Sequence, residues 1–212
     1  MQYIKGWKDL TVGVYEKILT SELNPEDPDG IYELAGLVYG MSKDEVMELP
    51  LAETAALIKS LEFLQRKPRP ILVKNTYKLG ETEYEFKSEA SQITTAQYID
   101  FNNTTKDPSH MSELISVFLV PKGKLYGKGY DYRQVIEDVK NHLSVPEALS
   151  MSDFFLYRWE SLLASTLKKT KRALKAARKD GAITKEQEKE TAEKLEQLTA
   201  MYGSTTSRPS LT

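Results

Sequence analysis

Hydrophobic residues recur at helical spacing through the first third of the chain. The first apolar stripe follows Thr11, a suitable helix cap, and comprises Val14, Tyr15, Ile18 and Leu19. Further helices are predicted over 31–39, where Gly40 supplies the terminating residue, and over 51–64, after Pro50. Between them, residues 42–45 (Ser-Lys-Asp-Glu) have the pattern of a capping box. The first third is therefore predicted to be a set of short helices.

The pattern changes in the middle of the chain. Residues 67–70 (Lys-Pro-Arg-Pro) end the helical spacing, and short apolar groups at 71–73, 77–79 and 84–86 favour strands, with Gly80-Glu81 as a hairpin turn. These groups predict a two- or three-stranded insert near 71–87. Helical spacing returns over 96–101, behind Thr94 or Thr95, and over 109–121, where Pro121 ends the helix.

The residue pattern over the last third of the chain predicts long helices. A helix is expected over 132–143, and a second, with Pro146 in its first turn, continues to about residue 179 and ends at Asp180-Gly181. Thr184 and Gln187 form another capping box, which opens a helix to about residue 201. The predicted fold is mainly α with a small antiparallel β insert (α+β). Its parts are a helical core over 1–165, a basic/acidic helical hairpin over 166–202 and a flexible small-polar tail over 203–212.

Composition removes several classes of active site. The 212 residues include no cysteine and two histidines, so disulfides, thiolate metal sites and cysteine nucleophiles are excluded. No pair of carboxylates stands in an apolar setting, as acid–base catalysis requires. We expect no catalytic residue, no cofactor and no metal. No segment approaches the roughly 20 apolar residues of a membrane-spanning helix, so no membrane association is expected.

Charge is distributed unevenly along a chain whose net charge is −2. Residues 22–66 contain 10 acidic and 3 basic side chains, whereas residues 161–179 contain seven basic side chains and no acidic one. The candidate contact residues in the basic segment are Lys168, Lys169, Lys171, Arg172 and Lys175. Three interpretations remain open: an antiparallel hairpin with the acidic helix that follows, a docking arm for an acidic or helical protein, and a nucleic-acid contact.

The order of several segments resembles a known family. The segments are Gly6-Trp-Lys-Asp-Leu-Thr11 followed by Tyr15, Gly40–Val46, a leucine-rich helix ending in Glu62-Phe-Leu64, the strand pair, Thr94–Phe101, Leu114–Pro121 and Phe154–Leu156. This order is similar to small tail-morphogenesis proteins of tailed phages that infect gut Bacteroidetes. The resemblance covers about residues 6–170, so most of the basic segment and the acidic helix lie outside it.

The resemblance implies a non-enzymatic tail assembly chaperone, which would bind the tape-measure protein in the host-cell cytoplasm during assembly. A permanent virion component, such as a neck, baseplate, tail or internal cargo subunit, is the alternative. A second alternative is a nucleic-acid-associated factor that uses the basic helix 168–179. Oligomerisation is compatible with each of these functions. Five aromatic residues are the other candidate contacts with phage proteins, with burial in the core as the alternative for each: Trp7, Tyr98, Phe101, Phe155 and Trp159.

Overall fold

The computed structural model describes residues 3–21, 23, 28–87, 92–104 and 107–204; the side chains of 28, 154–167, 195, 196 and 198–204 lie outside this description. Helices dominate, with short 3-10 helices marked η. In chain order the elements are η1 (Trp7–Asp9), α1 (Val12–Thr20), α2 (Pro28–Tyr39), α3 (Lys43–Met47), α4 (Leu51–Ser60), η2 (Leu61–Gln65), β1 (Thr76–Leu79), β2 (Thr82–Phe86), α5 (Thr95–Asn103), η4 (Pro108–His110), α6 (Met111–Ser116), β3 (Leu119–Pro121), α7 (Tyr132–His142), α8 (Val145–Lys179) and α9 (Lys185–Ser204).

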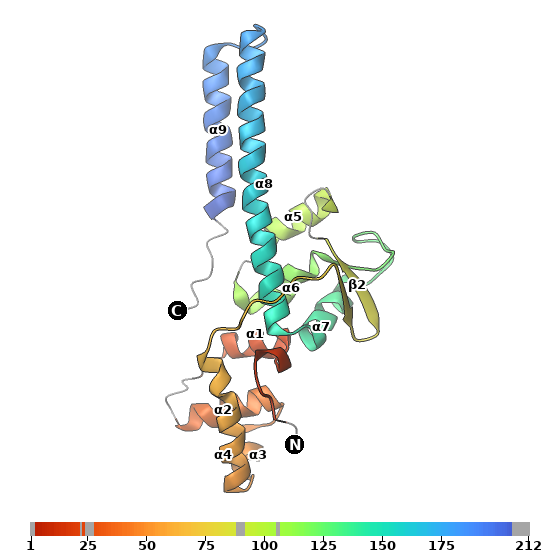
Figure 1. The fold of residues 1–212 in the computed structure, drawn as a ribbon, viewed down its shortest axis with the longest axis vertical. Coiled ribbons are helices and arrows are strands. Elements are labelled where there is room, and N and C mark those ends of the chain that lie inside the picture. Colours follow the sequence, from red (N-terminus) through yellow and green to blue (C-terminus); the bar gives the residue numbers. More distant parts are fainter. Residues whose placement is uncertain (1–2, 22, 24–27, 88–91, 105–106, 205–212) are drawn as a thin grey trace.

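The fold is mainly α with one small antiparallel sheet, which confirms the predicted class (Figure 1). The sheet has the order β1-β2-β3, and Gly80-Glu81 forms the predicted turn between the first two strands. Gly80 has a φ of 57°, which favours glycine there. The hydroxyl of Tyr84 donates to Asp138 Oδ2 at 2.6 Å and so fastens the sheet to α7.

Two predicted elements are wrong. Residues 71–73 form no strand; the Ile71 N–H donates instead to Ser150 Oγ of α8 at 2.9 Å. The helix predicted to reach Pro121 ends at Ser116, and residues 119–121 pair with β2. The side-chain amide of Gln97 donates to the Val117 carbonyl at 2.8 Å, and the Lys87 N–H donates to the Phe118 carbonyl at 2.9 Å. In the predicted helix these two carbonyls would belong to the last turn, where they lack intrahelical donors, and distant donors satisfy them instead.

We call the described part of the molecule up to residue 153 the body. Its core lies where α1, α6, α7 and the first turns of α8 meet, beside the sheet. The starts of α1 and α8 are tied by a short antiparallel bridge: Val12 N–H donates to the Leu143 carbonyl, and Val145 N–H donates to the Leu10 carbonyl, both at 3.0 Å. Thr11 therefore precedes α1 as predicted but makes no side-chain cap bond. The capping boxes at Ser42 and Thr94 are present.

The end of α2 depends on two glycines. Gly40 has a φ of 69°, and the Met41 N–H donates to the Gly36 carbonyl at 2.8 Å. This bond folds the chain back so closely that a Cβ on Gly36 would lie 2.6 Å from the Met41 carbonyl oxygen. The predicted end of the helix at Gly40 is confirmed. Gly36, inside the helix, leaves room for the Met41 carbonyl.

Helices α8 and α9 form an antiparallel hairpin that projects from the body (Figure 1). The turn begins at Gly181, with a φ of 72°, and the predicted box of Thr184 and Gln187 opens α9. An ion pair of 3.1 Å joins Arg178 to Glu188 across the two helices. None of the helices within the described ranges combines the length and apolar composition needed to cross a bilayer.

Candidate functional site

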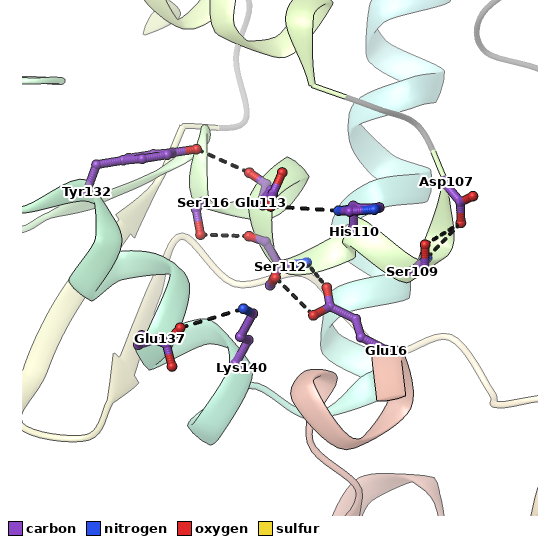
Figure 2. A network of polar contacts seen from close by, with 10 residues as sticks. All are labelled: Glu16, Asp107, Ser109, His110, Ser112, Glu113, Ser116, Tyr132, Glu137 and Lys140. Carbon is purple, nitrogen blue, oxygen red and sulfur yellow. Dashed lines mark hydrogen bonds and ion pairs between the residues drawn. The ribbon is translucent and has the colours of Figure 1, made fainter. Parts of the chain in front are cut away.

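A polar cleft of about 450 Å³ lies between α1, the start of α6 and the end of α7. Glu16 and Lys17 line it from α1, His110 precedes α6, and Lys140 lies on α7 (Figure 2). Helix α1 can approach α7 closely because Gly13 faces it: a Cβ at that position would lie 3.0 Å from the Lys140 carbonyl oxygen. The close approach brings charged residues of three helices to one place.

Glu16 is the buried charged residue of this cleft, with an exposed fraction of 8%. Its Oε1 accepts a hydrogen bond from the Ser112 N–H at 2.6 Å, and its Oε2 accepts one from the Ser112 hydroxyl at 3.1 Å (Figure 2). The Ser112 N–H belongs to the first turn of α6, where backbone donors lack partners within the helix. Glu16 is thus a cap supplied by a helix 96 positions earlier in the chain.

The titratable groups around Glu16 are held by structural contacts. The Ser112 hydroxyl donates to Glu16, while His110 Nδ1 lies 3.7 Å from Glu113 Oε1 in the next helical turn. The Ser112 hydroxyl therefore shares the Glu16 carboxylate with the N–H of its own residue, and both bonds lie at the start of α6. Among the described residues, no group of three or more histidine and carboxylate side chains is placed to hold a metal ion.

A second, apolar groove of about 370 Å³ opens beside η1 and η2. Its apolar wall includes residues from η1, α1, α2 and η2, namely Trp7, Tyr15, Ile18, Leu19, Leu23, Leu34 and Leu64. Leu19 has an exposed fraction of 42%, which is high for a leucine in a hydrophobic wall. Arg66 and Lys67 also line the groove, and they are the charged residues among the described part of its lining.

The groove has a fixed indole at one side. Trp7 Nε1 donates to the Arg66 carbonyl at 2.7 Å, and the ring meets Tyr15 and Phe63 edge to face at centroid distances of 5.9 and 5.4 Å. Burial raises the pKa of the Tyr15 phenol, which keeps this ring neutral well above pH 7. These contacts set the shape of the groove before any partner binds.

The aromatic contact residues expected from the sequence lie in different places. Trp7 lines the groove, Tyr98 is half-buried, and Phe101 is 2% exposed, with its ring 5.6 Å from that of Phe118. Phe101 is therefore a core residue in this conformation. The side chains of Phe155 and Trp159 lie outside the described residues.

The five basic contact residues lie on the hairpin. Lys168, Lys169, Arg172 and Lys175 are exposed, whereas Lys171 is half-buried. Together they carry positive charge along α8, remote in sequence from both the cleft and the groove. Of the expected contact residues with described side chains, Trp7 lines the groove and the five basic residues lie on α8.

Sequence reasoning missed Glu16, Leu19 and Arg66. Glu16 belongs to an ordinary amphipathic stretch, and its partner Ser112 is distant in sequence, so no local pattern marks it. Arg66 could have been noticed because it ends a leucine-rich helix next to two prolines. Comparisons with known protein families, with curated proteins and with solved structures found no match.

Proposed function

We propose that this chain is a non-enzymatic protein-binding protein whose groove beside Trp7 holds the apolar face of a partner helix. The observation that carries the proposal is the exposure of Leu19, which belongs to the apolar wall of the groove. Single exposed leucines are common on protein surfaces, but a leucine continuous with a groove of about 370 Å³ offers a place for a second apolar element.

The charge of the groove selects the kind of helix. Arg66 and Lys67 are the charged residues among the described part of its lining. An amphipathic helix with acidic residues next to its apolar row would therefore pair with both features of the groove. Apolar contact would supply most of the affinity, and the two cations would favour one orientation of the bound helix.

The resemblance in segment order extends this proposal to a tail assembly chaperone of a tailed phage. The bound helix would then belong to the tape-measure protein, and binding would take place in the host-cell cytoplasm while the tail is assembled. A permanent virion subunit would use the same groove for a lasting contact.

The test uses Leu19→Asp, which places a carboxylate in the apolar wall without disturbing a fully buried residue. A tape-measure protein from the phage that carries this gene would be purified and titrated against the variants. We expect Leu19→Asp to weaken binding at least about tenfold, since the bound helix would no longer bury the leucine. Leu72→Asp is the matched control, because Leu72 is 88% exposed and lies outside the groove.

Equal binding by wild type and Leu19→Asp would overturn the groove as the binding site. Mass spectrometry of purified particles and of infected-cell lysate separates the two assembly roles. A chaperone is abundant in the lysate and missing from particles, whereas a virion subunit is present in particles at a fixed copy number. Absence from both would overturn the assignment to phage assembly.

A further inference from the structure

The hairpin presents an exposed basic row that its partner helix does not neutralise. Lys168, Arg172, Lys175 and Lys179 follow one another at intervals of four, three and four residues, which places them on one side of α8. All four are exposed, and none forms an ion pair within the described part of the chain. We name these four residues the basic row.

The basic row points away from α9. The half-buried residues of the same stretch of α8 mark the side that packs on α9, and they are Thr170, Lys171, Leu174 and Ala177. Three acidic residues of α9 have other partners: Glu190 pairs with Lys194 at 2.6 Å, Glu193 with Lys189 at 3.8 Å, and Glu188 with Arg178. Within the described residues, the ion pairs of α9 therefore do not include the basic row.

Small residues flank the basic row. Ala173 and Ala176 are exposed on the neighbouring side of α8, where Lys169 lies one turn before Ala173, so another element could approach the backbone closely beyond that lysine. A partner that fits this face needs carboxylates for the row and an apolar group for the alanines. A phosphate backbone would use the charges and leave the alanines without a role.

The opposite end of the molecule has this complementary chemistry. At α3 and α4, Asp44, Glu48 and Glu53 are exposed and form no ion pair within the described residues. Among these carboxylates lie Met47 and Leu51, with exposed fractions of 55% and 86%. We name these five residues the acidic end.

The two surfaces cannot meet within one molecule. Figure 1 shows the tip of the α8–α9 hairpin at one extreme of the long axis and α3 and α4 at the other. We propose that the face of α8 that carries the basic row docks the acidic end of a second copy of this chain. Such a contact joins two different surfaces, so repetition produces open chains or closed rings rather than a symmetric dimer.

The test measures mass in solution, starting from a monomer of 24.1 kDa. Nucleic-acid-free protein would be examined by sedimentation velocity at about 50 mM and about 500 mM NaCl, because salt at the higher concentration screens exposed ion pairs. We expect species larger than the monomer at low salt, with an average mass that rises with protein concentration, and a shift toward monomer at high salt.

Charge reversal identifies the surfaces. One variant combines Lys168→Glu, Arg172→Glu, Lys175→Glu and Lys179→Glu; the other combines Asp44→Lys, Glu48→Lys and Glu53→Lys. Each variant alone has two ends of like charge and is expected to be monomeric. An equimolar mixture should associate again, because each end of one variant is complementary to an end of the other. Glu81→Lys, an exposed charge reversal in the β1–β2 turn, should associate like wild type.

Circular dichroism would show that both variants are folded, since every substituted side chain is exposed. A wild-type monomer at low salt, or a mixture that stays monomeric, would overturn the proposal. The proposal would also be overturned if wild-type protein stayed monomeric and bound a single-stranded oligonucleotide through the basic row. Leu19→Asp should leave self-association unchanged, which separates this proposal from the groove beside Trp7.

Discussion

At the scale of single residues, the side chains that hold this fold together often serve an element far away in the chain. Glu16 of α1 caps α6, and Gln97 of α5 satisfies the Val117 carbonyl after α6. Both are nearly or fully buried, with exposed fractions of 8% and 1%. Buried polar groups stabilise a structure when each is matched, and the loss of one partner leaves the other without a hydrogen bond.

Replacement of Glu16 tests this role. Glu16→Ala removes the acceptor for the Ser112 N–H and hydroxyl, and we expect the free energy of unfolding to fall by about 2–3 kcal/mol. Glu16→Gln keeps one side-chain oxygen as an acceptor, so it should lose about 1 kcal/mol. Urea unfolding followed by circular dichroism measures both. A loss below about 0.5 kcal/mol for Glu16→Ala would mean that water replaces the carboxylate at little cost.

At the scale of elements, tyrosines attach the glycine- and lysine-rich loop over 122–131 to α5 and the start of α7 to α6. The Tyr126 hydroxyl donates to Asp100 Oδ2 of α5 at 2.6 Å, and the Tyr132 hydroxyl donates to the Glu113 carbonyl of α6 at 3.2 Å. The Tyr130 hydroxyl accepts the Gly127 N–H at 3.2 Å. Burial, followed by the hydrogen bond to Asp100, raises the pKa of Tyr126, and burial also raises the pKa of Tyr130 and Tyr132.

These raised pKa values predict a loss of stability in alkali. An unfolded tyrosine ionises near pH 10, whereas the folded phenols hold their protons to higher pH. The contribution of these protonated phenols to the free energy of unfolding is therefore complete below about pH 10. It is lost as the pH rises toward the pKa that each phenol has in the folded protein. The loss is at most about 1.4 kcal/mol per pH unit for each tyrosine.

Urea unfolding at about pH 9 and about pH 11 measures this loss, and absorbance at 295 nm follows the ionisation. Lysines also lose charge in this range. Tyr126→Phe is therefore the reference: it lacks one of the phenols, and its stability should fall less between the two pH values. An identical fall in wild type and Tyr126→Phe would show that Tyr126 ionises alike in both states.

At the scale of the whole molecule, the body and the distal hairpin differ in how much they bury. Val135, Val139, Leu143, Val145 and Ala148 are each at most 1% exposed, and they belong to the body. On the distal part of α8, by contrast, most side chains from 168 to 179 are exposed. Helices that bury few large side chains rely mainly on their own hydrogen bonds, which open locally at a low free-energy cost.

We therefore expect hydrogen exchange to divide the molecule. Backbone amides of residues 168–194 should exchange at least about tenfold faster than those of residues 135–151, because the hairpin can open without unfolding the body. Exchange followed by mass spectrometry of peptides gives this comparison. Protein should be diluted in about 500 mM salt, so that self-association does not protect the basic row. Equal protection would indicate that both parts unfold as one unit.

Much of the fold could be predicted because its signals are local. The caps at Ser42, Thr94 and Thr184 act within four residues, and glycine at 40 and 181 permits a positive φ wherever the chain continues. The candidate sites were harder to predict. Trp7 was named as a contact residue, but the groove around it also needs residues from α2 and η2, whose proximity no local spacing encodes.

Local signals were sufficient for most helix boundaries, for the division of charge along the chain and for the exclusion of cysteine-based sites, because composition and hydrogen bonds between near neighbours decide these properties. Only the tertiary structure decided that residues 119–121 pair with β2, that Glu16 is buried against α6, and that the basic row and the acidic end lie at opposite extremes. Each of these outcomes depends on donors, acceptors or surfaces from distant segments, and the competition between a local and a distant partner is settled only when the chain is packed.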